Sequence, residues 1–519
     1  MQPKRVAIVG SGISGLAALW ALKSTDHEVH LYEAEDRLGG HTNTVVFQNE
    51  GQKINVDTGF IVCNAAAYLP YANTFFENPQ PANFLAFLRH LKIPTVATSM
   101  TFSISRDNGS FEWAWTSLNS LFAQRRNILR PSFWRMLLDI ARFNQFALDL
   151  LIEGEEDGAS DGEDGEGESA RSLESIGEYL ERNEYLQSFR NDYLIPMIAA
   201  VWSTGPNKRL FEFPASTLVR IMYNYQLLAT LSACPTWLTI PDGARTYISA
   251  LLSFFPASRI HTSTPIYSLS TNPTTDTVAL RFADGRKELF DHVILATHGD
   301  QAAKIVGRGV GASELEKKVL GGFATTRNIA ILHSDTNFLP TCPLAQASWN
   351  YLSHSPSPAN PRPPITLTYN LTQLQRLPPD SAPIFPNPIL LTLNPTSTPD
   401  PSLTHSSYTY SHPVYNSAAI CSQKLLHKIQ NRRGVSYAGA WTGYGLHEDG
   451  FTSGVRVAVE HLGAKVPFDV LSGRFVRGRP VLGWRDYAVR VFVVMVQLVI
   501  VLLSGGSWRH QKAPGKKPQ

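Results

Sequence analysis

Short apolar runs separated by glycine-rich turns open the chain and predict the start of a parallel sheet. Residues Val6 to Val9 form an uninterrupted apolar run, which is typical of a strand buried on both faces. Small and helix-forming residues follow from about Ser14 to Lys23, and a second strand is expected to end at Glu33. This strand, helix and strand predict an α/β domain with a Rossmann-type arrangement at the amino end.

Helical and strand patterns alternate through the rest of the chain. Between Ser132 and Leu151 apolar residues recur at helical spacing, which predicts a packed helix. From Thr262 onward, the runs TPIYSLS and TVALRFADG predict a strand pair, and HVILATHG predicts a strand that returns to the parallel sheet.

Two segments interrupt these patterns and are predicted to be disordered inserts. Residues 153–169 contain many acids and glycines but no large apolar side chain, so they lack what a packed core needs. A docking site for a basic partner is the alternative for this segment. Residues 354–364 are rich in proline, which favours a surface link between two strands.

Length, charge and cysteine content exclude several classes of protein. A chain of 519 residues exceeds one ordinary core, and its net charge of +3 gives no reason to expect a nucleic-acid partner. The four cysteines contain no CxxC pair, which argues against a zinc site and against a dense disulfide framework. No metal is therefore expected, and an intracellular, reducing location fits best. The first strand starts so early that no cleavable signal sequence is expected before it.

The turn after the first strand has the spacing of a dinucleotide-binding loop. Gly10 would permit the tight turn, Gly12 would leave space for a diphosphate, and Gly15 would let the helix pack closely on the sheet. Glu33 follows at the distance expected for a carboxylate that binds ribose hydroxyls, which implies a free 2′-hydroxyl. The predicted contacts with the dinucleotide are Gly10, Gly12, Ile13, Ser14, Gly15, Glu33 and Ala34.

The next segment, EAEDRLGGHTNT at residues 33–44, places an arginine and two glycines directly after the ribose acid. Here the chain resembles the superfamily of flavin-containing amine oxidases and phytoene desaturases, which binds FAD. The resemblance implies that Arg37, Gly39, Gly40 and Thr42 contact FAD. The superfamily usually has arginine after the glycine pair, whereas this chain has His41, which either faces the flavin or has a neutral structural role.

Two later segments carry the same resemblance. NVDTGFIVCN at residues 55–64 implies a backbone that passes beside the isoalloxazine ring, and residues 436–463 imply a strand, a glycine turn and a helix that points at the flavin. Amide groups around Gly450 to Ser453 would stabilise negative charge on the reduced ring. The backbone at Ile266 is expected beside the adenine. The remaining implied contacts with FAD are Thr58, Gly59, Phe60, Gly439, Asp449, Gly450, Phe451 and Thr452.

Five stretches together are similar to one subgroup of that superfamily, the predicted NAD/FAD-binding, amine oxidase-like proteins. They are DRLGGHTNT, VDTGFIV, SLFAQRRNILRPSFWRML, ASWNYL and GYGLHEDGFTSG. The similarity extends over nearly all of residues 5–463 outside the two inserts. It implies a link to the modification of unsaturated fatty acids, and hence a lipid substrate, by association.

The chain departs from the amine oxidase pattern in its candidate catalytic groups. Amine oxidases generally keep a lysine near flavin N5, but the strand-like stretch 325–335 contains Arg327 and no lysine. The predicted catalytic residues are instead Trp349, Tyr444 and His447. His447 could act as a base or be a structural histidine, and the aromatic residues would line an apolar pocket.

The carboxyl end, residues 464–519, is a basic tail with a hydrophobic helix predicted at residues 488–508. Its apolar core is shorter than the roughly 20 residues that a bilayer crossing needs, and Gln497 interrupts it. A membrane anchor or an interfacial helix is expected, and a helix packed on the protein or on a partner is the alternative.

These observations predict an α/β fold with an FAD-binding domain built from residues 1–70, 235–300 and 431–463. Residues 71–234 and 301–430 would form an interleaved α+β substrate domain. The expected function is an FAD-dependent oxidoreductase that transfers hydride from an apolar substrate, such as a lipid or fatty-acyl chain, to flavin. The alternatives are an amine oxidase that releases peroxide, a redox-neutral isomerase or mutase, and a non-catalytic FAD-binding membrane protein.

Overall fold

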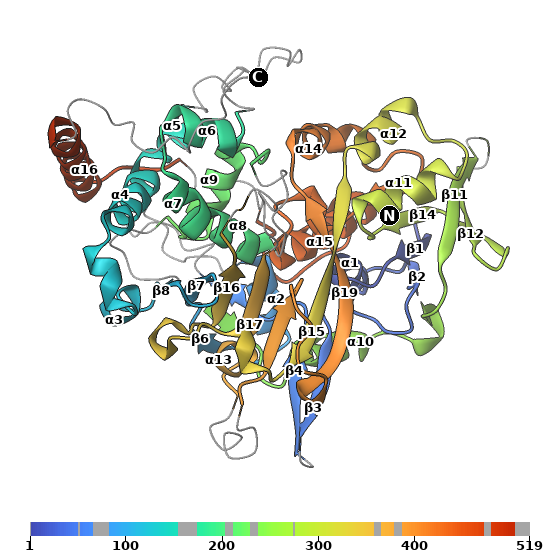
Figure 1. Cartoon of the computed structure of the whole chain (residues 1–519). Helices are drawn as coiled ribbons and strands as arrows, with labels where there is room; N and C mark the ends of the chain where they lie inside the picture. The colour runs from blue at the N-terminus through green and yellow to red at the C-terminus, as the bar shows by residue number, and fades with distance from the viewer. Residues whose placement is uncertain are drawn as a thin grey trace, which may run out of the picture.

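A five-stranded parallel sheet joins the amino end of the chain to segments from its middle and its carboxyl end (Figure 1). The computed structural model describes residues 2–49, 52–65, 82–153, 174–202, 211–228, 237–272, 274, 276–355, 357, 365–377, 387–471 and 479–503. The sheet has the strand order β10 (Ile260–His261), β2 (Glu28–Tyr32), β1 (Arg5–Val9), β14 (His292–Leu295) and β20 (Val435–Tyr437). All five strands fall within the three segments assigned to the FAD-binding domain, which supports that division as a proposal.

Both faces of β1 are buried, as its uninterrupted apolar run predicts. Val6 and Ile8 belong to the core on one face, which also holds α1 (Ile13–Leu22), α15 (His447–Leu462), α2 (Asn83–His90) and α10 (Arg245–Leu252). Ala7 and Val9 belong to the core on the opposite face. That core also holds α11 (Gly299–Gly307), α12 (Glu314–Gly321), α14 (Ser417–Ile429) and the antiparallel strands β11 (Ile266–Asn272), β12 (Thr277–Phe282) and β13 (Lys287–Phe290).

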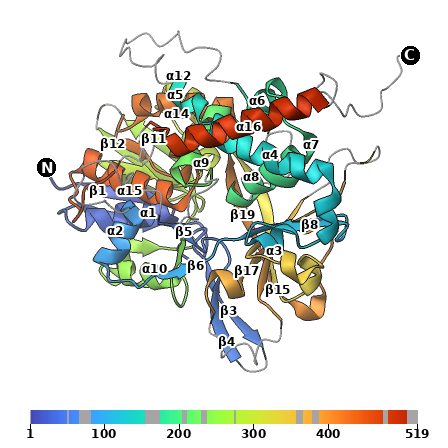
Figure 2. The ribbon, with the colours of Figure 1, turned by 90° about the vertical axis from the view of Figure 1, so that its left-hand side faces the viewer.

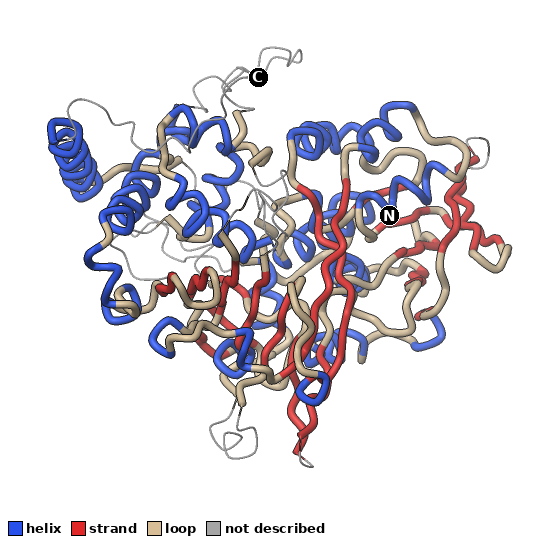
Figure 3. The backbone as a smooth tube through the Cα atoms, viewed as in Figure 1, coloured by secondary structure: helices blue, strands red, loops and turns tan. Residues whose placement is uncertain are grey.

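A seven-stranded sheet forms the second half of the molecule (Figure 3). Its order is β19 (Thr404–Val414), β15 (Ala324–His333), β18 (Leu390–Leu393), β17 (Thr366–Asn370), β16 (Trp349–Ser353), β7 (Phe102–Arg106) and β8 (Phe111–Ala114). One hydrophobic core packed on this sheet includes the hairpin of β3 (Thr44–Asn49) and β4 (Gln52–Asp57) and the short α13 (Leu371–Leu374). Another includes α4 (Pro131–Phe146), α5 (Asp149–Glu153), α6 (Ile176–Arg182), α7 (Gln187–Phe189), α8 (Ile195–Trp202) and α9 (Ala215–Asn224).

Three short strands, β5 (Cys63–Asn64), β9 (Trp237–Thr239) and β6 (Val96–Thr98), form a further sheet. The short helix α3 (Leu118–Leu121) follows β8 and packs against it. The chain therefore has the mixed α/β architecture that the sequence predicts, with a parallel sheet on one side and a larger, mostly antiparallel sheet on the other.

The local predictions are mostly confirmed. The strand pair and the returning strand are β11, β12 and β14, and the proline-rich segment follows β16 and precedes β17. The helix predicted at residues 132–151 is instead two helices, because α4 ends at Phe146 and α5 starts at Asp149. Except for residues 153, 354, 355 and 357, both predicted inserts, 153–169 and 354–364, lie outside the described residues.

The hydrophobic helix predicted at residues 488–508 is α16 (Trp484–Leu503), and residues 504–508 lie outside the described part. Figure 2 shows α16 running along the outside of the molecule beside α4. Within the described residues, no helix combines the length and the apolar character that crossing a membrane requires. The membrane-spanning form of the predicted anchor is therefore not supported.

Candidate functional site

A cavity of about 630 Å³ lies where the carboxyl ends of β1, β2 and β14 approach β16, β17 and β19. Its wall includes the turn after β1, the loop after β2, the loop after β4 and the start of α15. The sequence-predicted residues that line it are Gly10, Gly12, Ile13, Ser14, Glu33, Ala34, Arg37, Gly39, Gly40, His41, Thr42, Gly59, Phe60, Ile266, Trp349, Gly439 and His447. Segments far apart in the sequence thus meet at one cavity.

The glycines of the first turn have separate physical roles. Gly10 has a φ of +100°, and a Cβ there would lie 2.7 Å from the carbonyl oxygen of Ala296. A Cβ on Gly15 would lie 1.9 Å from the carbonyl oxygen of Gly10, so a glycine here allows α1 to pack closely on the turn. Gly15 does not line the cavity. A Cβ on Gly12 would meet no atom within 4 Å. The bare backbone of Gly12 at the amino end of α1 is therefore open to an anionic ligand.

The predicted ribose acid is held at the edge of the cavity. The Oε2 atom of Glu33 accepts hydrogen bonds from the backbone N of Ser11 at 2.8 Å and from Ser11 Oγ at 2.6 Å. Its Oε1 atom accepts from the backbone N of Glu35 at 2.9 Å. Ser11, which the sequence analysis did not single out, therefore fixes the orientation of this carboxylate.

The second glycine pair lies directly against the first turn. A Cβ on Gly40 would lie 3.2 Å from the Cα atom of Gly12, and the backbone N of Gly39 donates to the carbonyl oxygen of Ser11 at 3.1 Å. The Nη1 atom of Arg37 is buried without a hydrogen-bond partner among the described residues. A buried guanidinium nitrogen without a partner beside a bare backbone fits a diphosphate.

Close backbone packing holds the loop after β4 on the segment around His41. The backbone N of Phe60 donates to the carbonyl oxygen of His41 at 2.9 Å, and a Cβ on Gly59 would lie 2.0 Å from the same oxygen. The neighbouring Thr58 does not line the cavity, because its hydroxyl bonds to Tyr410 Oη at 2.7 Å. These contacts fix the part of the wall where the resemblance places the isoalloxazine ring.

His447 lies at the start of α15 with its ring stacked on Phe60, at a centroid distance of 3.7 Å. Its Nε2 atom lies 3.3 Å from the Tyr247 hydroxyl. Burial lowers the pKa of His447 to about 3, so its imidazole is neutral and a weak proton acceptor near neutral pH. This geometry favours the structural alternative for His447, and a catalytic role for it stays a prediction.

The helix that points at the cavity begins earlier than the sequence predicts. The backbone N of Gly450 already donates to the carbonyl oxygen of Leu446 at 3.1 Å, because α15 begins at His447. Residues off the cavity wall include Asp449, whose carboxylate accepts from the backbone N of Leu446 at 2.9 Å, and Phe451, which lies in the core. The other predicted residues that do not line it are Tyr444, Gly450 and Thr452.

Several wall residues were not foreseen. His298 follows β14, Tyr410 and His412 lie on β19, and Tyr369 lies on β17. Large apolar and aromatic side chains also line the cavity, and we call this group the aromatic end: Trp349, Tyr369, Tyr225, Trp237, Leu227 and Leu85. The Nε1 atom of Trp349 is buried without a hydrogen-bond partner among the described residues. It is thus a donor available to a ligand among mainly aromatic side chains.

The chain matches known proteins at the level of family and fold. Residues 13–338 match the family of flavin-containing amine oxidoreductases. L-amino acid oxidases from Cerastes cerastes and Demansia vestigiata are 50% and 44% identical to it over 55 residues, which is 11% of this chain and 11% of the length of each relative.

Three solved structures share the fold at low sequence identity. Putrescine oxidase bound to putrescine has a TM-score of 0.58 at 13% identity, covering 89% of this chain and 99% of that one. A fatty acid isomerase from P. acnes has a TM-score of 0.54 at 13% identity, covering 88% and 98%. Reduced UDP-galactopyranose mutase has a TM-score of 0.53 at 15% identity, covering 89% and 94%.

The family match agrees with the geometry of the cavity. The open backbone at Gly12 and the unpartnered nitrogens of Arg37 and His41 fit the diphosphate of FAD, and FAD is the cofactor that the sequence predicts. The enzyme class, an FAD-dependent oxidoreductase of the amine oxidase type, is confirmed as well. This chain belongs to the flavin-containing amine oxidoreductase family.

Proposed function

We propose that the protein oxidises an apolar, lipid-like substrate by removing hydride from a carbon atom. The observation that carries this proposal is the aromatic end of the cavity, to which Trp349, Tyr369 and Trp237 contribute large apolar surfaces. Such a wall gains most from burying hydrocarbon. The fatty acid isomerase of the same fold acts, by its title, on a fatty acid.

The residues of the chain have separate tasks in this proposal. Gly12, Gly40 and Arg37 would hold the diphosphate of FAD, and Glu33 would hold a ribose. Bound FAD supplies the acceptor for the hydride. The amino end of α15, which begins at His447 on the cavity wall, would stabilise negative charge there through the helix dipole. Trp349 and Tyr369 would exclude water and position the substrate carbon.

The cavity offers little support for amine oxidation. Among the described residues of its wall the one lysine is Lys304, whose Nζ atom lies 3.0 Å from an oxygen of Asp300 on α11. That helix packs against β11, the strand that starts with Ile266 and is expected beside the adenine. This lysine therefore lies on the side of the expected adenine and not on β16 or β17, the strands that carry Trp349 and Tyr369.

Anaerobic titration of the flavin tests the proposal. The holoenzyme is mixed without oxygen with unsaturated fatty acids, with their esters or with a panel of amines, and the visible absorbance of flavin is followed. We expect bleaching by an acyl lipid and none by an amine. Bleaching by amines with peroxide release in air would establish the amine oxidase instead. An isomerised lipid without net bleaching would establish the redox-neutral enzyme.

Variants of Trp349 separate its two contributions. Trp349→Phe keeps an aromatic ring but removes the N–H donor, whereas Trp349→Ala also opens the apolar wall. We expect Trp349→Phe to raise KM for a lipid that carries a polar head by about tenfold, the value of one hydrogen bond. Trp349→Ala should lower kcat/KM further, and both variants should keep FAD. Unchanged kinetics in both variants would exclude substrate from this end of the cavity.

We also propose that α16 rests on an anionic membrane surface without crossing it. Val493 is 1% exposed, and Arg490 donates to Asp149 at 2.8 Å, which fixes the inner side of the helix on the protein. Its outer side carries large apolar groups that are more than half exposed, namely Trp484, Tyr487, Val491, Phe492, Met495, Leu498, Val499 and Leu502. Arg485 is exposed on the same helix, and the sequence after it carries Arg509, Lys512, Lys516 and Lys517. Apolar side chains flanked by cations fit an interfacial helix on anionic lipid.

Flotation with vesicles tests the membrane contact. The full chain should float with vesicles that contain phosphatidylserine and should float much less with phosphatidylcholine alone. Replacing Phe492 and Leu498 by serine should abolish flotation, whereas Phe254→Ser, a change at another exposed aromatic residue, should not. No flotation with either vesicle, or a dimer in solution that the α16 variant disrupts, would overturn this proposal.

A further inference from the structure

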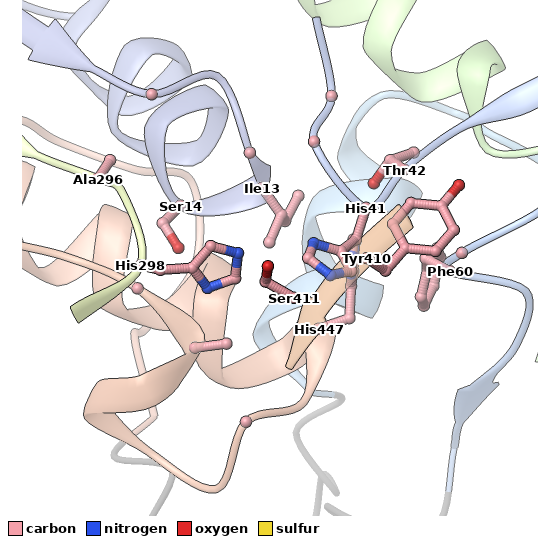
Figure 4. A pocket seen from close by; sticks show the side chains of 18 of the residues that line it. Ile13, Ser14, His41, Thr42, Phe60, Ala296, His298, Tyr410, Ser411 and His447 are labelled. Atoms are coloured by element: carbon pink, nitrogen blue, oxygen red, sulfur yellow. The ribbon is translucent and has the colours of Figure 1, made fainter. Parts of the chain in front are cut away.

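Three histidines from separate parts of the chain meet in the cavity. His41 follows the glycine pair, His298 precedes the first residue of α11, and His412 lies on β19. The centroid of the His41 ring lies 5.4 Å from that of His298 and 5.2 Å from that of His412. Figure 4 shows His41, His298 and Ser411 gathered around the same part of the cavity. No task in the proposed function uses this cluster.

The surroundings keep all three imidazoles neutral while no anion is close. Burial lowers the pKa of His41, His298 and His412, in the last case to about 4. His412 and His298 lower the pKa of His41 further, and His298 lowers that of His412. Arg37 also lowers the pKa of His41, whereas Asp300 raises that of His298. The remaining neighbours are the Tyr410 ring, 5.1 Å from His41, and Lys304, which is paired with Asp300.

Hydrogen bonds decide which ring can accept a proton. The Nδ1 atom of His412 lies 2.6 Å from Asn328 Nδ2, and Asn328 Oδ1 accepts from Asn394 Nδ2 at 2.8 Å. The Asn328 amide therefore donates to His412, whose own proton must sit on Nε2, and His412 has no open acceptor. His41 bonds to the backbone of Ser411, but its Nε2 atom is buried without a partner among the described residues. This nitrogen has a free lone pair.

The free lone pair lies next to the expected diphosphate. His41 directly follows Gly40, whose backbone touches Gly12 at the amino end of α1, and Arg37 stands on the same wall. An anion here attracts positive charge strongly, because the buried site screens it poorly. Protonating Nε2 would turn an unpartnered acceptor into a donor aimed at the ligand.

We propose that His41 takes up one proton from solvent when the diphosphate of FAD enters the cavity, and then donates it from Nε2 in a hydrogen bond to a phosphate oxygen. The proposal rests on the FAD site of the proposed function. One N–H bond forms at Nε2 as the bond that held the proton in hydronium or a buffer acid breaks, and nothing is oxidised or reduced. His298 and His412 stay neutral and hold His41 in place. Binding of FAD is then coupled to proton uptake, so the complex weakens as the pH rises.

Calorimetry and pH-dependent release of FAD test the proposal without an activity assay. Apoprotein is titrated with FAD at pH 8 in two buffers of different ionisation enthalpy, and FAD retained by holoenzyme after ultrafiltration is measured between pH 6 and 9. We expect uptake of about one proton per FAD, and a dissociation constant that rises about tenfold per pH unit where free His41 is neutral. His41→Arg, permanently charged, should bind FAD without proton uptake and with little dependence on pH.

Two further variants assign the proton to one ring. His41→Asn should bind FAD more weakly at pH 6 and lose the proton uptake, whereas His427→Gln, at an exposed position on α14, should behave like the natural protein. Uptake that persists in His41→Asn, or that disappears in His298→Asn alone, would overturn the assignment to His41. FAD that binds with no proton uptake would refute this inference alone, whereas failure to bind FAD at any pH would refute the proposed function.

Discussion

Replacement of Gly12 by alanine separates binding of the cofactor from folding. Gly12 has φ −62° and ψ 176°, which any residue adopts, and an added Cβ would meet no atom within 4 Å. Alanine is a poorer helix N-cap than glycine by up to about 1 kcal/mol, but it also restricts the unfolded chain by about 0.4–1 kcal/mol. The two effects oppose each other, so the free energy of unfolding should change by less than about 1 kcal/mol.

Binding of FAD should respond far more strongly to the same methyl group. A phosphate oxygen bonded to a backbone N–H sits about 2.9 Å from the nitrogen, whereas a methyl carbon keeps heavy atoms about 3.5 Å away. The diphosphate must therefore retreat and lose at least one charge-assisted hydrogen bond, worth about 1.5–3 kcal/mol. The dissociation constant for FAD should rise about 10- to 100-fold.

Flavin fluorescence titration of the apoprotein measures the affinity, and urea unfolding of the same samples measures stability. Gly307→Ala is the matched control, because a Cβ at this exposed position at the end of α11 also meets nothing within 4 Å. It should leave the affinity for FAD unchanged and alter the free energy of unfolding by no more than about 1 kcal/mol. Gly12→Ala protein that binds FAD with unchanged affinity would refute the placement of the diphosphate on this turn.

Three further substitutions probe the packing and the buried charges. Gly454→Ala would place a Cβ 2.0 Å from the carbonyl oxygen of Ser14, so α15 and α1 must separate, and urea unfolding should show a loss of about 1–3 kcal/mol. Burial raises the pKa of Asp57 from 3.8 to about 7, so the folded state binds the extra proton and its stability falls as the pH rises from about 4 to 7. Asp57→Asn should remove that fall, worth about 2–3 kcal/mol between pH 5 and 8, and an unchanged pH profile of unfolding would contradict it. Arg106 donates to Asp192, and burial raises the pKa of Asp192 to about 6. Arg106→Ala should lower the free energy of unfolding by about 3–5 kcal/mol at pH 8. The loss should be smaller at pH 5, where Asp192 is protonated, and unfolding curves at the two pH values measure the difference.

The parts of the site that could be predicted are those that depend on residues close together in the sequence. A buried strand, three spaced glycines and a carboxylate determine one turn because every contact among them is local or lies between neighbouring strands. The placement of Gly10 and Gly15 follows directly, since each supplies a position where a Cβ would strike the backbone of the same turn or the neighbouring strand end. Such steric requirements can be recognised in a single sequence as glycines at fixed spacing.

The start of α15 was misplaced for a reason that is also local. The helix-end amides were expected around Gly450 to Ser453, but Asp449 accepts from the backbone N of Leu446, the N-cap residue, and the helix begins at His447. An acid three residues after the N-cap was the signal that could have located the boundary. Glu448 adds a tertiary reason, since its carboxylate accepts from the backbone N of Asn83 at 2.9 Å and of Phe84 at 2.9 Å, at the start of α2.

The residues of β19 could not be assigned to the site from the sequence. Its run THSSYTYSHPV is mixed and carries no motif, and nothing in it indicates which side chains face a cavity. Tyr410 and His412 reach the cavity because β19 pairs with β15 in one register, with Tyr410 opposite Asn328 and His412 opposite Thr326. A shift by one residue would turn both side chains to the other face of the sheet. The information lies in a long-range pairing, not in the local pattern.

The cofactor and the substrate are expected to contact different sheets, so different mutations should change the binding of each. The end of the cavity at which we propose the diphosphate is built mainly from backbone groups beside the parallel sheet, where a substitution acts through sterics, as at Gly12. The aromatic end is built from side chains on β16 and β17, including Trp349 and Tyr369, which pair with each other in register. Side chains on strands can change without moving the backbone of the other sheet. Substrate preference can therefore vary at β16 and β17 while the FAD site stays intact, which is consistent with one fold shared by a putrescine oxidase, a fatty acid isomerase and a sugar-nucleotide mutase.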